Sequence, residues 1–221
     1  MNKKQVIQAL EEAKKNSPKR KFSQTVDLII NLKQINLKKP EEKVDFFVSL
    51  PHGKGKKAKV CAFVDNALVK DAEANCDKVI LNSDFSKLKS ELRTFKKIVR
   101  EYDFFIAQAN LMPDIAKNFG RYLGTKGKMP NPKAGCIVAP KGETKPVCEM
   151  LQNLIRVITK ADTIIKCPLG TEDMTSEQIA DNFMIVYNQL VNTLPQHEQN
   201  INSILLKLTM GKPVKVRETT K

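Results

Sequence analysis

Residues 84–107 read Asp-Phe-Ser-Lys-Leu-Lys-Ser-Glu-Leu-Arg-Thr-Phe-Lys-Lys-Ile-Val-Arg-Glu-Tyr-Asp-Phe-Phe-Ile-Ala, and they decide the fold class of the central part of the chain. Apolar side chains recur there at alternating intervals of three and four residues: Phe85, Leu88, Leu92, Phe95, Val99 and Tyr102. This spacing predicts a single amphipathic helix over 84–101 with one buried face. The apolar run 104–107 follows almost at once and predicts a strand.

The alternation of strand and helix extends on both sides of this stretch. Strands are predicted over 59–64 and 79–81, with a short helix over 66–75 between them, and further helices over 113–123 and 144–153. Strands joined through helices run parallel with right-handed crossovers. We therefore predict an α/β fold class, with a Rossmann-like three-layer domain in the middle of the chain.

The stretch 119–132, Phe-Gly-Arg-Tyr-Leu-Gly-Thr-Lys-Gly-Lys-Met-Pro-Asn-Pro, overlaps the end of the helix over 113–123. Its three glycines and two prolines disfavour regular structure, and three of its side chains are cationic. We interpret it as a long irregular basic loop. It is not a phosphate-binding P-loop, because Tyr122 stands where the first glycine belongs and Met129 follows Lys128.

The two ends of the chain have a different pattern, typical of an antiparallel α+β domain. Helices are predicted over 3–15 and from 175 onward, and strands over 25–32, 44–50, 155–159, 163–167, 202–209 and 214–216. Thr175-Ser-Glu-Gln178 matches a capping box, and the helix it opens has Ile179, Phe183, Val186 and Leu190 on its inner face. We expect 25–32 to pair with 44–50, and 155–159 with 163–167 as a hairpin.

These patterns predict two domains. Residues 1–57 together with 154–221 form a discontinuous α+β domain with an antiparallel sheet, in the manner of a split RRM-like fold, and 58–153 form the inserted Rossmann-like domain. The basic, glycine-containing segment 51–57 is the expected linker. Two connections then cross between the domains, which permits hinge motion.

The charge of the chain points to a polyanionic partner. The formal net charge is +14 over 221 residues, and the cations are spread over 19–21, 54–59, 87–100 and 207–217. Such a distribution suits a folded surface laid along nucleic acid. No segment approaches the roughly 18 apolar residues of a membrane span, and the N-terminus has no signal-peptide pattern, so we expect a cytoplasmic protein without a membrane partner.

The sequence contains no recognisable catalytic, metal-binding or dinucleotide-binding motif. The five cysteines include no Cys-x-x-Cys pair, and only His52 and His197 are histidines, so neither a metal nor another cofactor is predicted and the thiols are interpreted as buried and reduced. A dinucleotide site needs glycines at the first strand–helix turn, yet none occurs between Gly55 and Gly120. A Cys–His nucleophilic pair and a nucleotide-dependent enzyme remain minor alternatives.

Taken together, six motifs resemble the ribosomal protein L-one family, the universal large-subunit proteins of the mobile side stalk, in its archaeal type. They are Lys21-Phe-Ser-Gln-Thr-Val-Asp27, Leu50-Pro-His-Gly-Lys-Gly-Lys56, Tyr102-Asp-Phe-Phe-Ile-Ala-Gln-Ala109, Leu123-Gly-Thr-Lys-Gly-Lys-Met-Pro130, Met174-Thr-Ser-Glu-Gln-Ile179 and Leu208-Thr-Met-Gly211. Their order and spacing cover nearly the whole chain.

The resemblance implies an RNA site in the domain built from the chain ends. The residues that match it, or that lie beside it as cations, are Arg20, Lys21, Phe22, Thr25, Lys160, Ser203, Lys207, Thr209, Met210, Gly211 and Lys212. Glycine permits close approach of an RNA backbone, a Thr hydroxyl can bond a 2′-OH, Met can lie against a sugar or base, and Lys contacts phosphates. The turn near 160 reads Lys160-Ala-Asp162 in place of the family's Asp-Lys or similar pair, so only Lys160 is carried over.

Each assignment has a plainer structural alternative: Phe22 as a core residue, 209–211 as the end of a strand, and 19–21 as a solvated run. The resemblance implies a non-enzymatic constituent of the large ribosomal subunit, monomeric when free. Its expected partners are stalk rRNA, exit-site tRNA during release of deacylated tRNA, and its own mRNA, whose translation it represses. The other alternative is a nonspecific nucleic-acid-binding protein.

Overall fold

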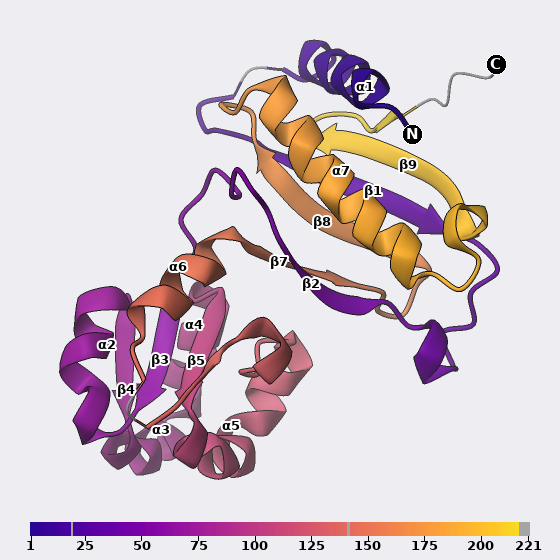
Figure 1. The fold of residues 1–221 in the computed structure, drawn as a ribbon. Coiled ribbons are helices and arrows are strands. Elements are labelled where there is room, and N and C mark those ends of the chain that lie inside the picture. The colour runs from indigo at the N-terminus through magenta and orange to yellow at the C-terminus, as the bar shows by residue number, and fades with distance from the viewer. Residues whose placement is uncertain (19, 141, 217–221) are drawn as a thin grey trace. The chain divides into compact units, whose positions relative to one another are not determined.

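The computed structural model describes residues 1–18, 20–140 and 142–216, so Lys19 and Arg217 of the predicted basic runs lie outside it. Two compact units make up the chain. Unit 1 comprises Met1–Lys56 and Asn153–Lys221, and unit 2 comprises Lys57–Gln152. Helices and strands of both units occur with parallel and antiparallel pairing, which confirms the predicted α/β class (Figure 1).

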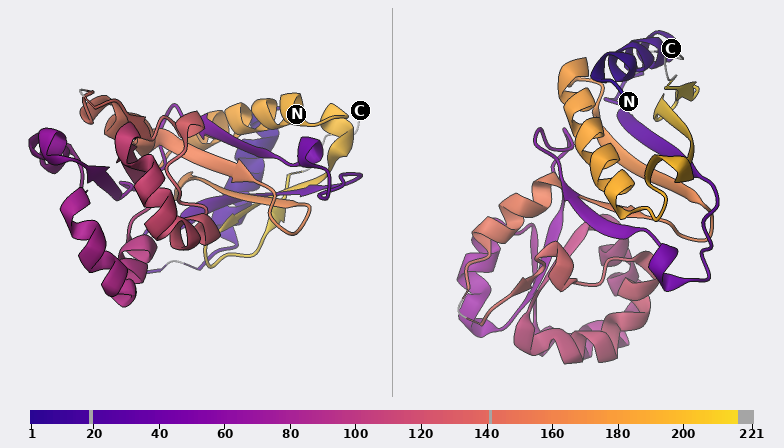
Figure 2. Two further views of the ribbon diagram at one scale, coloured as in Figure 1. Left: turned by 90° about the horizontal axis from the view of Figure 1, so that it is seen from below. Right: turned by 45° about the vertical axis from the view of Figure 1, so that its right-hand side comes forward.

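Unit 1 is built on a four-stranded antiparallel sheet in the order β10-β9-β1-β8. Its elements are α1 (Lys3–Lys15), β1 (Thr25–Leu32), β2 (Asp45–Ser49), β7 (Leu154–Ile158), β8 (Ile164–Thr171), α7 (Ser176–Thr193), β9 (Ile201–Leu208) and β10 (Val214–Lys215). Helices α1 and α7 lie on one side of this sheet (Figures 1 and 2), and their buried residues share one core with alternate residues of the strands. The other side of the sheet carries half-buried residues of β1 and β9 and exposed residues of β8 and β10.

Two expected pairings in unit 1 are wrong. Strand β2 pairs with β7 in a separate two-stranded sheet and not with β1, because both edges of β1 are occupied by β8 and β9. Strands β7 and β8 form no hairpin ladder, since a single antiparallel bridge, Thr159 to Ile165, joins their ends before they enter different sheets.

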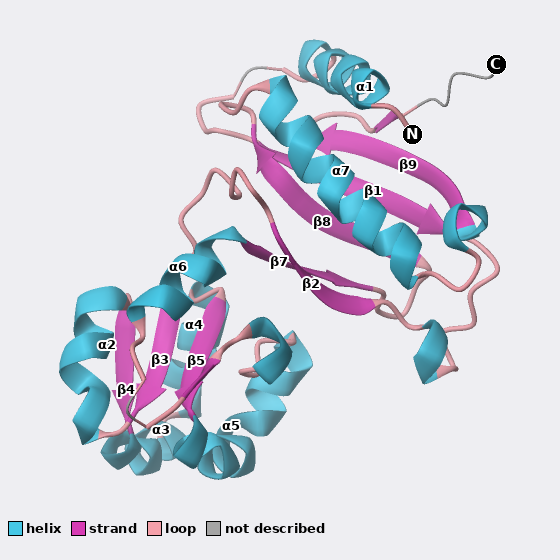
Figure 3. Ribbon diagram, in the orientation of Figure 1, coloured by secondary structure: helices cyan, strands magenta, loops and turns pink. Residues whose placement is uncertain are grey.

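Unit 2 is a parallel sheet in the order β4-β3-β5-β6 with helices packed on it (Figure 3). Its elements are β3 (Val60–Val64), α2 (Val69–Asn75), β4 (Lys78–Leu81), α3 (Phe85–Ser90), α4 (Leu92–Glu101), β5 (Phe104–Gln108), α5 (Met112–Lys126), β6 (Ile137–Val138) and α6 (Lys145–Asn153). Every residue of β3 is buried, as expected for a central strand of a parallel sheet covered on both faces.

The helix predicted over 84–101 is two helices, α3 and α4, separated at Glu91 with φ −101° and ψ 58°. The aromatic core explains the break. The Phe119 ring contacts both Phe85 and Phe95, with centroid distances of 5.4 and 4.3 Å. In one straight helix these two residues would lie about 15 Å apart along the axis and could not both reach one ring.

The irregular loop predicted over 119–132 is also wrong in its first half, because α5 runs through Gly120 and Gly124 to Lys126. Its stripe of Ile115, Phe119 and Leu123 is fully buried, and this packing outweighs the low helix propensity of two glycines. Gly127 ends the helix with a left-handed φ of 67°. Lys128 then donates to the carbonyls of Val99 and Tyr102, so it caps α4.

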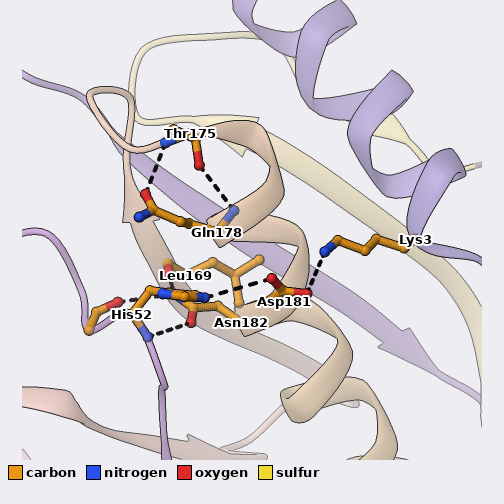
Figure 4. A network of polar contacts seen from close by, with 8 residues as sticks. Lys3, His52, Leu169, Thr175, Gln178, Asp181 and Asn182 are labelled. Carbon is orange, nitrogen blue, oxygen red and sulfur yellow. Dashed lines mark hydrogen bonds and ion pairs between the residues drawn. The ribbon is translucent and has the colours of Figure 1, made fainter.

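Side chains of helix α7 bind His52 and Gly53, in the segment that leads from β2 to unit 2 (Figure 4). The predicted capping box is present at Thr175 and Gln178. Asn182, fully buried, donates to the carbonyls of Gly53 and Leu169 at 3.0 and 2.8 Å and accepts from the amide of His52 at 3.3 Å. Next to it, Asp181 contacts Lys3 at 2.7 Å and His52 at 3.6 Å.

Replacing Asn182 by Ala should lower the free energy of unfolding by about 2–4 kcal/mol, because two carbonyls and one amide lose their partner in a buried site. Chemical denaturation measures this change. Asn188→Ala, on an exposed position of the same helix, should change stability by less than about 0.5 kcal/mol. Equal effects of the two substitutions would contradict the anchoring role of Asn182.

Candidate nucleic-acid interface

The end of β9 is bonded to the start of β1 through Thr25 and Thr209. The amide of Thr209 donates to the carbonyl of Thr25 at 3.0 Å, and the amide of Thr25 donates to Oγ1 of Thr209 at 3.1 Å. That hydroxyl also lies 3.3 Å from the Thr25 carbonyl and donates to it. The only hydroxyl hydrogen of Thr209 is therefore used within the protein, and one acceptor lone pair is left for a ligand.

Gln24 fixes the turn that follows β9. It is only 1% exposed, its Oε1 accepts from the amide of Met210 at 3.1 Å, and its Nε2 lies within 3.4 Å of acceptors on Ser17, Pro18 and Glu172. The turn closes with the amide of Gly211 donating to the carbonyl of Leu208. Sequence reasoning missed Gln24, because nothing in a lone glutamine beside a strand signals its burial.

Two large apolar side chains are exposed at this end of the sheet. Phe22, just before β1, is 51% exposed and Met210, just after β9, is 56% exposed. The core alternative for Phe22 is therefore wrong. Both side chains are therefore accessible to a partner that contacts this end of the sheet.

Gly211 has a packing reason of its own. A Cβ at this position would lie 3.1 Å from Oγ of Ser17 and 3.3 Å from Cβ of Leu208. The glycine thus lets the turn approach the segment that follows α1, whether or not a ligand also lies close to its backbone.

The predicted cations differ in their surroundings. Arg20, Lys21 and Lys212 are exposed near the turn, and Lys207 is half-buried on the face of the sheet away from the helices. The register places Lys207 directly opposite Asp27 on β1. Burial raises the pKa of the Asp27 carboxyl, and the charge of Lys207 opposes this rise.

The remaining two predicted residues lie at the other end of the sheet. Oγ of Ser203 accepts from Nδ2 of Asn31 at 2.8 Å, six positions along β9 from Thr209, or roughly 20 Å. Lys160 is exposed in the connection between β7 and β8, where Thr163 bonds Leu32 at the far end of β1. The structure thus gathers Arg20, Lys21, Phe22, Thr25, Thr209, Met210, Gly211 and Lys212 at one end and leaves Lys160 and Ser203 apart from them.

Unit 2 carries a separate basic surface on α3, α4 and α5. Its exposed cations are Lys87, Lys89, Arg93, Lys96, Lys97, Arg100, Lys117, Arg121 and Lys126. None of them forms an ion pair with another residue that the structure describes. Nζ of Lys96 lies 5.5 Å from the centre of the Tyr122 ring, a cation–π contact between α4 and α5.

Within residues 1–18, 20–140 and 142–216, no three His, Cys, Asp or Glu side chains come together as a metal ion would require. Over the same residues, no helix has the length and apolar character needed to cross a membrane.

Comparison with known proteins decides the family. Residues 10–212 match the Ribosomal protein L1p/L10e family. The chain belongs to this family. It is 38% identical to the large ribosomal subunit protein uL1 of Thermococcus kodakarensis, over 96% of each chain. It is 43% identical to that of Nanoarchaeum equitans, over 90% of this chain and 93% of the relative, and 38% identical to that of Archaeoglobus fulgidus, over 98% and 99%.

Membership in the L1p/L10e family confirms the resemblance to archaeal ribosomal proteins of the large subunit. The relatives are named as components of the ribosome and not as enzymes, which agrees with the prediction of a non-enzymatic protein. The family also confirms the expected ribosomal location in the cytoplasm.

Substituting Asp27 by Asn tests the electrostatics of the sheet face. The folded-state pKa of this acid is raised, so its ionised form is disfavoured by folding and destabilises unit 1 at neutral pH. The Asn variant should be more stable than wild type at pH 7, and the difference should vanish below about pH 4. Denaturation at several pH values measures it.

Asp181→Asn is the control, for which the expected change in stability at pH 7 has the opposite sign. Lys3 lowers the pKa of Asp181, so that carboxylate stabilises the fold above its ordinary pKa, and its loss should destabilise at pH 7 but not in acid. An Asp27→Asn protein less stable than wild type at pH 7 would overturn this account of the sheet face.

Proposed function

We propose that this chain binds rRNA of the mobile side stalk through unit 1 and is a structural constituent of the large ribosomal subunit, with unit 2 as an inserted domain. The observation that carries the proposal is the turn that follows β9, whose backbone is hydrogen-bonded to Gln24 and Thr25. The exposed side chains of Phe22 and Met210 flank a backbone held by Thr25, Thr209 and Gln24, and the exposed cations Arg20, Lys21 and Lys212 adjoin these residues in the sequence. Membership in a ribosomal protein family supports RNA as the ligand.

The proposed recognition is of RNA shape and requires no bond chemistry. RNA is recognised largely through its 2′-hydroxyls, its backbone and unstacked bases, which stack on flat or polarisable apolar side chains. Phe22 and Met210 supply such surfaces, and the free lone pair of Thr209 can accept a hydrogen bond from a 2′-OH. Arg20, Lys21 and Lys212 neutralise phosphates, which adds a salt-dependent contribution to affinity.

Ser203 and Lys160 extend the proposed contact along the sheet. Ser203 lies on the same open face as Lys207, and its hydroxyl is already bonded to Asn31. An RNA that touched Thr209 and Ser203 together would have to span roughly 20 Å of the sheet. We assign Lys160 a phosphate contact at that far end.

Binding to a stalk rRNA fragment and to a scrambled hairpin of equal length, measured across salt concentrations, tests the proposal. Wild type should prefer the stalk fragment by a hundredfold or more, about 2.7 kcal/mol. Met210→Asp should abolish the preference, because a carboxylate replaces an apolar contact beside phosphates. Thr209→Val should reduce it, because the variant lacks the hydroxyl that bonds Thr25 and is proposed to accept from a 2′-OH.

Ile185→Asp is the matched control for Met210→Asp, since Ile185 is also exposed (39%) but lies on α7. It should leave the preference unchanged. Equal binding of both RNAs, with steep salt dependence and indifferent variants, would indicate the nonspecific nucleic-acid-binding alternative.

The basic helices of unit 2 favour a second RNA contact, which we assign to exit-site tRNA during its release. The resemblance to the L-one family also supports binding to a stalk-like structure in the protein's own mRNA, with repression of its translation. The observation behind the tRNA assignment is the set of exposed cations on α4 and α5, none of which forms an ion pair with another residue that the structure describes. Exposed cations of this kind contact phosphates without reading the base sequence.

A double variant on α4, Lys97→Glu with Arg100→Glu, should weaken binding of deacylated tRNA about tenfold or more, because two phosphate contacts become repulsive. Filter binding measures this loss. Lys70→Glu with Lys145→Glu reverses the same charge on α2 and α6 and should have a much smaller effect. Weakened binding of the stalk rRNA fragment by the α4 variant, with tRNA binding intact, would contradict the assignment.

A further inference from the structure

Two free thiols meet between α2 and α6 in unit 2. Cys76 directly follows α2 and Cys148 lies in the first turn of α6. Their Sγ atoms are 3.2 Å apart, although the residues are 72 positions apart in the sequence. Cys148 is 6% exposed and Cys76 is half-buried, so solvent reaches the pair through Cys76.

Hydrogen bonds one turn away hold the two helices in this arrangement. Thr144, fully buried just before α6, donates from its amide and its hydroxyl to Oδ2 of Asp71 on α2, at 2.7 and 2.8 Å. Asn75 donates to the carbonyl and to a carboxylate oxygen of the same Asp71. The hydrogen bonds between Thr144 and Asp71 therefore fix the positions of the two thiols relative to each other.

The other three thiols have different surroundings. Cys61, Cys136 and Cys167 are all buried, and burial raises the pKa of Cys61 and of Cys167 to about 12. A cysteine attacks a disulfide only as the thiolate, so these buried groups are unreactive in the folded protein. At the pair, one hydrogen bond joins the two sulfurs, and either can donate it. With Cys76 as the donor, the bond lowers the pKa of Cys148 and raises that of Cys76.

We propose that Cys76 and Cys148 form a redox-active dithiol, a site that low-molecular-weight disulfides such as oxidised glutathione convert into an intramolecular disulfide. The required movement is small. The sulfurs must approach by about 1.2 Å to reach the bond length of about 2.0 Å. The Thr144–Asp71 contacts place them within that reach before any oxidant arrives.

The reaction is two thiol–disulfide exchanges. Ionisation of the pair leaves one proton shared between the two sulfurs. When that proton lies on Sγ of Cys148, the reachable sulfur of Cys76 is a thiolate; it attacks one sulfur of the small disulfide, forms a mixed disulfide and releases one small thiolate, which takes the proton from Cys148. Cys148 then attacks Sγ of Cys76, the protein disulfide forms and the second small thiolate leaves. The two cysteines lose two protons and two electrons, and the small disulfide is reduced to two thiols.

The bond would tie α6 to α2 where both chain connections enter unit 2. At the end of α6, the side chain of Gln152 accepts from the amide of Ala58 at 2.7 Å and donates to its carbonyl at 3.1 Å. A disulfide at Cys148, one turn before Gln152 on the same helix, would stabilise the Gln152–Ala58 hydrogen bonds. It would also close most of unit 2 into a covalent loop.

The experiment incubates the full-length protein in buffers of graded glutathione redox poise, traps free thiols by acid quenching and alkylation, and maps disulfides by mass spectrometry. We expect the number of free thiols, counted by alkylation of the unfolded chain, to fall from five to three, with one linkage, between Cys76 and Cys148, that dithiothreitol reverses. The oxidised protein should melt at least about 5 °C higher than the reduced protein.

Cys136→Ser is the matched control and should keep the linkage, whereas Cys76→Ser should lose it and the shift in Tm. The wild-type peptide map needs no variant, so it decides the question even if a variant folds poorly. Five free thiols at every redox poise, a linkage between other cysteines, a disulfide between two copies of the chain or a stable glutathione adduct would each overturn the proposal.

Discussion

Strand β1 is hydrogen-bonded on both edges by strands from the other end of the chain, and unit 1 depends on this pairing. Thr25 to Asn31 pair with β8 on one side, and Val26 to Leu32 with β9 on the other. Unsatisfied backbone groups in a buried strand are costly, so the first strand of the chain cannot be completed until residues beyond 163 have folded. Unit 2 is therefore inserted between two halves of one sheet.

The proposed RNA site follows from the same pairing. Because β9 runs antiparallel to β1, Leu208 at the end of β9 pairs with Val26 near the start of β1, and Thr209, the next residue, bonds Thr25. Gln24, immediately before β1, can then reach the amide of Met210. Residues 184 and 186 positions apart thus share one ordered turn, on which Phe22 and Met210 project into solvent. The dithiol of unit 2 has a comparable origin, since one pair of packed helices brings together thiols that the sequence keeps far apart.

Local periodicity predicted most of the secondary structure because burial on one face imposes it. The helices α1 and α7 and the strands β1 and β9 occur where alternation or a three-and-four spacing placed them. Predictions failed where a distant side chain overruled the local pattern. Phe85 and Phe95 both pack against the ring of Phe119, and this packing requires two helices where the apolar spacing predicted one continuous helix. The buried stripe of α5 carries a helix through two glycines that propensity alone would exclude.

By itself, the sequence determined the α/β class, the basic character of the chain, and, through motifs at both ends, its membership in a ribosomal protein family and the residues of the proposed site. Periodicity, charge and motif order are local properties, which explains why they could be read. Only the tertiary structure decided which strands pair, which predicted residues share one end of the sheet, and that Gln24 supports the turn. Those outcomes depend on contacts between residues more than a hundred positions apart, and no local pattern encodes them.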